Sequence, residues 1–249
     1  MDQEEELERL EENWNALGEK DPMWAVLYDP DKKGNNWDPD EFYATGSKEI
    51  SALITYLTDL GLEPSGARAL DFGCGLGRLT QPLADHYELA MGVDIAASMI
   101  DGARARNTRG DRCEFVLNVA ADLSRFDDAS FDLVHSRIVL QHIPVDLALG
   151  YMREFVRIAR PGAIITFDFP SGPVPGVKGF VAKWTPRAAL NVLRRIRYRD
   201  TSVMEMHWLP APDVIAAVAE CGARLVDDRP IPAAPGAHVV KHQFCFVRS

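Results

Sequence analysis

Short apolar runs and segments of helical spacing alternate through the middle of the chain. The short apolar runs predict buried strands, at 67–73, 88–95, 113–118, 131–137 and 162–169. The segments between or beside them predict helices, at 77–86, 97–107 and 145–159. Since strands that alternate with helices form βαβ units, the pattern indicates a parallel sheet covered by helices.

The segment before the first strand has a different pattern. Residues 1–20 are strongly acidic and indicate a helix or a frayed tail, whereas residues 21–47 are rich in Pro, Gly, Asn and aromatic residues. Because its tryptophans need somewhere to bury, we interpret 21–47 as an ordered irregular cap. Ser47 is a candidate N-cap for a helix that Gly61 ends. The apolar face of this helix has the 3–4 spacing, at Ile50, Leu53, Ile54 and Leu57.

After the fifth strand the alternation breaks. Residues 170–210 hold prolines, glycines and a basic segment. Regular structure is predicted again beyond them, as a helix at 212–221 and as strands at 223–228 and 241–248. The chain therefore contains seven predicted strands, of which the last two lie outside the alternating core.

The charge balance narrows the range of partners. The 249 residues include 37 acidic and 27 basic side chains, which gives a net charge of −10. Such a chain repels phosphate backbones, so we expect no nucleic-acid partner. The basic stretch 187–199 is ordinarily a solvated face. A homodimer, in which this stretch meets the acidic first residues of a second copy, is a further hypothesis.

Cysteine usage and the N-terminus predict a cytoplasmic location. The cysteines form no CxxC pair or Cys/His cluster, which disfavours a zinc site and favours reduced core thiols, at Cys74, Cys113, Cys221 and Cys245. The N-terminus lacks the apolar stretch of a signal peptide. No apolar run approaches the roughly 20 residues needed to span a bilayer, so we expect no membrane span.

A glycine-rich turn after the first strand carries the main chemical signal. The sequence DFGCGLG at 71–77 lies where a strand ends and a helix begins. Glycines there let the backbone approach a ligand closely, and free N–H groups at a helix start favour polar oxygen ligands. The turn alone would equally suit a dinucleotide-binding enzyme.

Three features separate this turn from a dinucleotide site. Asp71 precedes the glycines, where it would repel a pyrophosphate but accommodate an ammonium group. Asp94 ends the second strand about 20 residues later, where a carboxylate can accept hydrogen bonds from both hydroxyls of a ribose. The glycine spacing is GxGxG rather than GxGxxG.

Five segments, in order, resemble the class I S-adenosylmethionine-dependent methyltransferases. Residues 69–80 resemble motif I of that family and residues 92–99 resemble motif II. Residues 120–123 are similar to the segment that caps the adenine, 131–136 to the fourth strand, and 157–163 to the turn before strand five. A further similarity, of DPMWAV and FYATG near the N-terminus, is to bacterial methyltransferases associated with glycan or lipid decoration.

The resemblance implies a fold and a division of the chain. The fold is an α/β, Rossmann-like, doubly wound sheet of seven strands, mostly parallel with an antiparallel last strand, in a single methyltransferase domain over 1–249. Its expected parts are N-terminal cap helices at 1–60, a cofactor-binding core at 67–170, a variable substrate-cover insertion at 171–210, and a C-terminal helix with an antiparallel strand pair at 211–249.

The resemblance also assigns roles in a cofactor site. Asp71 would lie near the ammonium group of the methionine part, Asp94 would bind the ribose hydroxyls, and Asp122 would accept from the adenine amino group. The structural alternatives are a turn-capping carboxylate for Asp71 and a loop acid for Asp122. Three glycines would shape the turn: Gly73, Gly75 and Gly77. The other cofactor-binding residues that the motifs imply are Cys74, Arg78, Ile95, Met99, Leu123 and Ser136.

His142 is the candidate general base for methyl transfer. It follows the fourth strand, at the edge where doubly wound folds bind ligands, and a neutral histidine can accept a proton near neutral pH. A histidine hydrogen-bonded to backbone is the alternative. His207 and Trp208 are candidate substrate contacts in the variable region. Asp168, at the end of the fifth strand, could contribute to a magnesium site, although the sequence shows no ligand cluster.

We expect S-adenosylmethionine-dependent O-methylation of a hydroxyl on a small molecule or sugar. The NPPY or DPPY motif that the family's nitrogen-methylating enzymes often carry after strand four is replaced by SRIV at 136–139. The alternatives are C- or N-methylation of a lipid- or quinone-like metabolite, a nucleotide-dependent oxidoreductase, and a non-catalytic cofactor-binding subunit. The expected partner is therefore a small-molecule or glycan acceptor.

Overall fold

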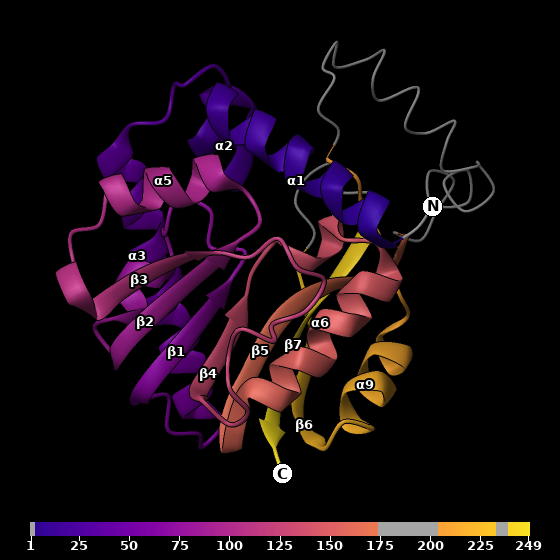
Figure 1. Ribbon diagram of the computed structural model, residues 1–249. Helices are drawn as coiled ribbons and strands as arrows, with labels where there is room; N and C mark the ends of the chain where they lie inside the picture. Colours follow the sequence, from indigo (N-terminus) through magenta and orange to yellow (C-terminus); the bar gives the residue numbers. More distant parts are fainter. Residues whose placement is uncertain (1–2, 174–203, 233–238) are drawn as a thin grey trace.

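The computed structural model describes residues 3–173, 204–232 and 239–249, and its centre is a seven-stranded sheet (Figure 1). The strands are β1 (Gly66–Phe72), β2 (Tyr87–Asp94), β3 (Cys113–Leu117), β4 (Phe131–Ser136), β5 (Ala159–Pro173), β6 (Ala223–Ile231) and β7 (Val239–Arg248). Their order is β3-β2-β1-β4-β5-β7-β6, and β7 runs antiparallel to the other six strands. The predicted doubly wound α/β fold with an antiparallel last strand is confirmed.

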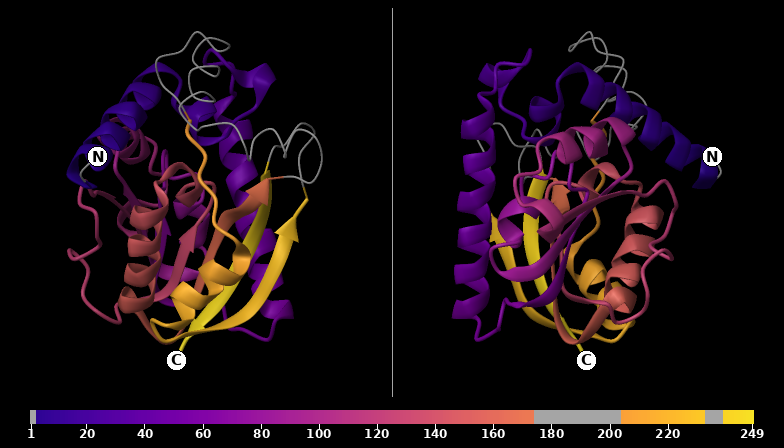
Figure 2. Two further views of the ribbon diagram at one scale, coloured as in Figure 1. Left: turned by 90° about the vertical axis from the view of Figure 1, so that its right-hand side faces the viewer. Right: turned by 60° about the vertical axis from the view of Figure 1, so that its left-hand side comes forward.

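Helices cover both faces of this sheet. The α-helices are α1 (Gln3–Lys20), α2 (Pro22–Val26), α3 (Pro39–Asp59), α4 (Thr80–Leu83), α5 (Ala97–Ala105), α6 (Val145–Ile158) and α9 (Ala211–Ala219). Short 3-10 turns are η1 (Pro30–Lys32), η2 (Gly110–Arg112) and η3 (Leu140–His142). The right-hand view of Figure 2 shows α3 on one side of the sheet and α6 with α9 on the other. Helices α1 and α2 lie across the carboxyl ends of β1 and β2 (Figure 1).

The alternation of side chains along the strands supplies a core on each face. In β1, Ala69 packs with α3 residues such as Leu57, while its neighbour Leu70 packs with α6 residues such as Phe155. Successive strand residues point to opposite faces, so an all-apolar strand is stable only when both faces are covered. The continuous apolar runs of the sequence therefore correspond to strands buried between two helical layers.

The largest correction to the predicted elements concerns the start of α3. The helix begins at Pro39 rather than near Ser47, and Asp38 caps it by accepting a hydrogen bond from the Glu41 N–H at 2.9 Å. Aspartate before proline supplies both a side-chain cap and a preset φ, so the first turns form within a segment rich in Pro and aromatics. Gly61, with φ +74°, does follow the end of this helix as predicted.

Other boundaries also differ from the prediction. The helix expected at 77–86 is reduced to α4, because the chain up to Leu79 stays in turns after Gly77, whose φ is +75°. Strand β5 is longer than 162–169 because β7 pairs with it as far as Pro173. The acidic start forms helix α1 rather than a frayed tail. Cys221 is exposed, whereas the other three cysteines are buried as predicted.

Two sequence predictions concern parts of the chain beyond this description. The basic stretch 187–199 and most of the expected insertion at 171–210 lie outside the described residues. Among the helices of the described ranges, none is both long enough and apolar enough to cross a membrane.

Candidate functional site

A cavity lies at the carboxyl ends of β1, β2 and β4. The space that it encloses, together with the open solvent at its mouth, is about 960 Å³. Connections from β1 and β4 leave toward opposite sides of the sheet, and doubly wound folds bind ligands at such a point. Helix α1 and the α2 segment contribute the cover of the cavity, with Leu7, Leu10, Trp14, Ala25 and Val26.

The glycine turn forms one wall of this cavity. The N–H groups of Gly73 and Cys74 both donate to the Val93 carbonyl oxygen, at 2.8 and 3.0 Å, which folds the turn over the end of β2. Gly73 has φ +75°, and a Cβ at this position would lie 2.3 Å from the Val139 side chain. Only glycine tolerates both the left-handed backbone and this close approach.

Asp71 places a buried carboxyl group beside the turn. Its side chain is 2% exposed and lines the cavity, and its Oδ2 accepts a hydrogen bond from the Thr80 hydroxyl at 2.6 Å. Burial raises the pKa of Asp71 to about 6, while the Thr80 hydrogen bond acts in the opposite direction. A cation bound in the cavity would favour the charged form of this group, so the site suits an ammonium ligand.

Asp94 lines the cavity at the end of β2, as predicted. Its Oδ2 accepts from the Gly75 N–H at 2.8 Å, and its Oδ1 accepts from the Ala96 N–H at 2.9 Å. Burial raises the pKa of Asp94, and the backbone hydrogen bonds oppose that rise. A carboxylate oxygen has two lone pairs, so each oxygen can still accept a hydroxyl. Asp94 is therefore fixed in place and able to bind a diol.

Two arginines bring positive charge to the cavity lining. Arg78 is 3% exposed, and its Nη1 lies 2.8 Å from Oε2 of Glu49 on α3. Arg137 follows β4; its Nε lies 2.6 Å from Glu49 Oε1 and its Nη1 lies 2.8 Å from Asp168 Oδ2. Burial alone would raise the pKa of Glu49, but the two arginines together lower it. The two arginines and the two carboxylates, Glu49 and Asp168, form a cluster of charged side chains with no net charge. This cluster lies between the glycine turn and the loop after β4.

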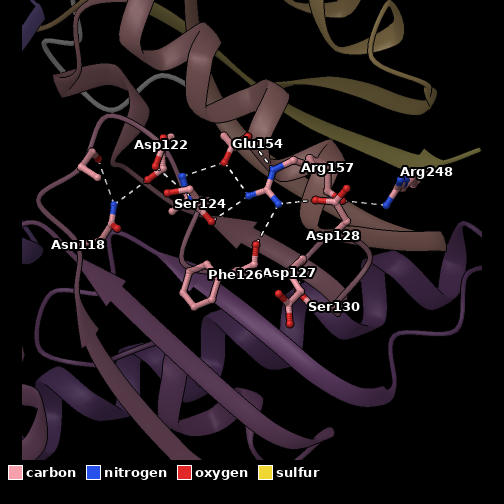
Figure 3. A network of polar contacts seen from close by, with 12 residues as sticks. Asn118, Asp122, Ser124, Phe126, Asp127, Asp128, Ser130, Glu154, Arg157 and Arg248 are labelled. Atoms are coloured by element: carbon pink, nitrogen blue, oxygen red, sulfur yellow. Dashed lines mark hydrogen bonds and ion pairs between the residues drawn. The ribbon is translucent and has the colours of Figure 1, made fainter.

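The loop between β3 and β4 flanks the far end of the cavity, where Asn118 is part of the lining. The Asn118 side-chain amide donates to the carbonyl oxygens of Ala120 and Asp122, at 3.1 and 3.0 Å (Figure 3). The Asp122 side chain is exposed, and the Ser124 N–H that it accepts at 3.1 Å lowers its pKa. In this structure Asp122 is therefore an exposed loop acid, and its adenine contact stays a prediction.

Arg157 of α6 fastens this loop to the body of the protein. Its guanidinium donates to the carbonyl oxygens of Leu123 and Phe126, both at 2.9 Å, and it pairs with Glu154 at 2.8 Å and Asp128 at 2.6 Å (Figure 3). One side chain thus links four points of the loop and helix.

His142 is buried beside the cavity but is not part of its lining. Its Nδ1 lies 2.7 Å from the Glu205 carbonyl oxygen, which can only accept, so Nδ1 carries the proton. Nε2 then accepts from the Gln141 amide at 2.8 Å. The Trp14 ring, which does line the cavity, contacts His142 edge-on at 5.3 Å between centroids. Its role as a base stays a prediction.

The remaining predicted residues lie around these groups. His207 is buried, and its backbone N–H donates to the Gln141 carbonyl oxygen at 2.8 Å. Neither His207 nor Trp208 lines the cavity. The Asp168 carboxylate is occupied by Arg137 and by the Ile138 N–H, at 2.6 Å, and the described residues contain no cluster of three candidate metal ligands. The geometry at Asp168 therefore does not fit a magnesium site.

The structure gathers most of the predicted cofactor residues in one place. Eight of them line the cavity: Asp71, Gly73, Cys74, Gly75, Arg78, Asp94, Ile95 and Met99. Gly77 packs against Phe115, Leu123 lies in the core, and Ser136 donates its hydroxyl to the Phe72 carbonyl at 3.0 Å. Other lining residues were not predicted from the sequence, among them Trp14, Asn118, Arg137 and Tyr151. A signal for the first was present, because Leu7, Leu10 and Trp14 have helical 3–4 spacing.

Residues 70–167, from β1 to β5, match the family model of a methyltransferase domain. Residues 70–167 carry a methyltransferase domain. In fold, this methyltransferase domain is similar to the crystal structure of magnesium protoporphyrin IX methyltransferase from Synechocystis PCC 6803 with bound S-adenosylhomocysteine (SAH). The TM-score is 0.65 at 18% identity, over 98% of this chain and 100% of the other. The crystal structure of an S-adenosylmethionine-dependent methyltransferase from Mesorhizobium loti is also similar. Its TM-score is 0.57 at 17% identity, over 78% of this chain and 96% of the other.

Curated relatives match over shorter stretches. The ubiquinone biosynthesis O-methyltransferase of Xanthomonas axonopodis pv. citri is 31% identical over 102 residues, which is 41% of this chain and 42% of that protein. The phosphoethanolamine N-methyltransferase of Triticum aestivum is 28% identical over 144 residues, 57% of this chain and 27% of that protein. The chain thus spans less than half the length of either relative.

Proposed function

We propose that this chain transfers the methyl group of S-adenosylmethionine to an oxygen atom of a small molecule. The observation that carries the proposal is the placement of Asp71 and Asp94 in one cavity, at the ends of neighbouring strands, with the glycine turn between them. An ammonium group and a ribose diol are the two parts of S-adenosylmethionine that carboxylates would recognise. A pyrophosphate would be repelled by Asp71.

The chain's own residues would hold this cofactor along the cavity. Asp71 binds the ammonium group, Arg78 offers a positive charge to the methionine carboxylate, and Asp94 accepts from the ribose hydroxyls. Ile95 and Asn118 lie at the end where the adenine would pack. The cofactor supplies a methyl group activated by its sulfonium, and alignment with the acceptor lowers the barrier.

The oxygen acceptor is supported by two observations. SRIV replaces the NPPY or DPPY motif after β4, and the ubiquinone biosynthesis O-methyltransferase is 31% identical over 102 residues. The second candidate is nitrogen methylation, which the longer match to phosphoethanolamine N-methyltransferase favours. Whether the hydroxyl belongs to a sugar or to another small molecule is part of the same test.

The experiment is product analysis with S-adenosylmethionine and acceptors of three classes: phenols, sugar alcohols and primary amines. SAH release is followed by chromatography, and the methylated product is located by mass spectrometry. We expect an O-methylated product, and loss of turnover in Asp94→Asn. Methylation of amines alone would replace the oxygen proposal by the nitrogen one, and no SAH release with any class would contradict both.

Variants of His142 test the base within this proposal. If His142 accepts the hydroxyl proton, His142→Ala should lower kcat by about a hundredfold or more, with SAH affinity unchanged. The control variant is Gln141→Ala, which removes the side-chain amide that donates to His142 Nε2 but leaves the histidine in place. Unaltered turnover in His142→Ala would assign the residue a structural role against Trp14 and Glu205.

A further inference from the structure

Ile138 has a backbone conformation that is unusual for its side chain. Its φ is +62°, and it lies in the cavity lining, two residues beyond the end of β4. Among the described residues, the other non-glycine positions with positive φ are Asn35 and Ala129. A β-branched side chain in the left-handed region is strained, and such strain persists only where surrounding contacts impose it.

Asp168 on β5 supplies those contacts. Its Oδ1 accepts from the Ile138 N–H at 2.6 Å, and its Oδ2 pairs with the Arg137 guanidinium at 2.8 Å. The Asp168 side chain is almost fully buried, and Arg137 is held from its other side by Glu49. A buried carboxylate with two charge-assisted contacts is a strong local restraint.

The restrained segment sets the distance between two cavity walls. Val139, the next residue, packs so closely on Gly73 that a Cβ there would lie 2.3 Å from it. The direction in which Ile138 turns the chain therefore decides whether Val139 lies against the glycine turn. Residues 137–139 all line the cavity, so a relaxed Ile138 would change its shape.

We propose that Asp168 is a positioning residue for the cofactor cavity: it holds Ile138 in the left-handed conformation and so fixes the wall that faces the glycine turn. This inference rests on the proposed function for its ligand. It gives Asp168 a role through backbone geometry, in place of the metal role considered from the sequence, because both carboxylate oxygens are already engaged.

The test compares Asp168→Asn with the same substitution of a carboxylate that makes the same two kinds of contact at the amino ends of the strands. Asp132, near the start of β4, also accepts from one backbone N–H (Arg68, 2.8 Å) and pairs with one arginine (Arg160, 2.9 Å). An asparagine offers only one acceptor oxygen, so either substitution loses one of the two contacts. SAH affinity is measured by calorimetry and stability by thermal unfolding.

We expect SAH affinity to fall about tenfold in Asp168→Asn and to stay at the wild-type value in Asp132→Asn. Adding Ile138→Gly to Asp168→Asn should restore affinity to within about threefold, because glycine adopts the left-handed conformation without a restraint. A purely structural role would lower the melting temperature of both single variants without this rescue. Equal affinities in wild type and Asp168→Asn, or failure of the rescue, overturn the inference.

A crystal structure of Asp168→Ala, which keeps neither carboxylate contact, gives a readout that does not depend on any ligand. We expect φ of Ile138 to leave the left-handed region, and an unchanged φ overturns the inference. Failure of the wild-type chain to bind SAH would contradict the proposed function alone, since the backbone test would still decide the role of Asp168.

Discussion

Asp71 is a carboxyl group whose charge near neutral pH depends on its surroundings. Its burial raises the pKa to about 6, so protonated and charged forms exchange within the ordinary working range. Binding an ammonium group requires the charged form. A proton and the cofactor therefore compete for Asp71, and this competition can be measured.

We predict that SAH affinity falls as the pH decreases through about 6. Below this pKa the free protein carries a neutral Asp71, so each further pH unit should weaken binding by up to about tenfold. Thr80→Val removes the hydrogen bond that lowers this pKa, and the midpoint should then move to higher pH. Calorimetry between about pH 5 and about pH 8 checks both statements. If the affinity for SAH stays constant over that pH range, Asp71 does not bind the ammonium group.

Gly73 has a left-handed backbone conformation and also lies very close to Val139. The effects of these two features on a substitution can be measured separately. Gly73→Ala should weaken SAH binding by more than about tenfold, because its Cβ would displace Val139. Gly162→Ala is the matched control, since Gly162 has φ +81° but open space around a Cβ. The control should lose about 1 kcal/mol of stability with unchanged affinity. Equal affinities for the two variants would contradict the close-contact argument.

Side chains of α6 hold the loop between β3 and β4: Tyr151 donates to the Ala120 carbonyl oxygen, Glu154 accepts from the Leu123 N–H, and Arg157 makes the largest number of these contacts. The loop has no helix of its own between Asn118 and Phe131, and Arg157 binds two of its carbonyl oxygens. The ion pairs of Arg157 are partly exposed and so contribute little, whereas the bonds to backbone fix the loop.

Arg157→Met should therefore destabilise the fold by about 1–2 kcal/mol and loosen the loop that carries Asp122. Hydrogen exchange at residues 118–128 would report the loosening, and thermal unfolding the stability. Arg109→Met, which removes the exposed pair with Asp85 at 2.7 Å, is the control and should cost less than about 1 kcal/mol. Unchanged exchange in Arg157→Met would show that other contacts hold the loop.

The strands and the glycine turn were predictable because their signals are local. A buried parallel strand needs apolar residues on both faces, so a strand such as β5, with AIITF at 163–167, stands out in the sequence. The turn and Asp94 lie directly at strand ends, where their positions follow from the strands. The start of α3 was missed because its cap, Asp38, lies in a segment whose prolines and aromatics resemble an irregular loop.

The rest of the site could not be predicted because it is assembled by tertiary contacts. Trp14, Arg137 and Asp168 belong to three elements that meet only in the folded sheet. No spacing along the chain indicates that Asp168 accepts the Ile138 N–H, or that Glu49 on α3 pairs with two arginines. Buried charged clusters of this kind need the packed structure before they can be recognised.

In the whole molecule, segments from distant parts of the chain are joined beside the cavity. Arg9 of α1 donates to both carboxylate oxygens of Glu205, at 2.7 and 3.2 Å. The His207 and Arg9 contacts lower the pKa of Glu205 to about 2, and its carbonyl oxygen also accepts from His142. The N-terminal helix and the segment before α9 are thus joined beside the site that the sheet creates.

We propose that Asp71, the glycine turn and Asp94 together hold S-adenosylmethionine in this cavity. Calorimetry of the wild-type chain with SAH and with NAD, repeated on Asp94→Asn, tests it most directly. We expect binding of one SAH per chain, no binding of NAD, and an affinity for SAH at least about tenfold weaker in the variant. Absence of SAH binding, binding of NAD instead, or equal affinity in Asp94→Asn would contradict it.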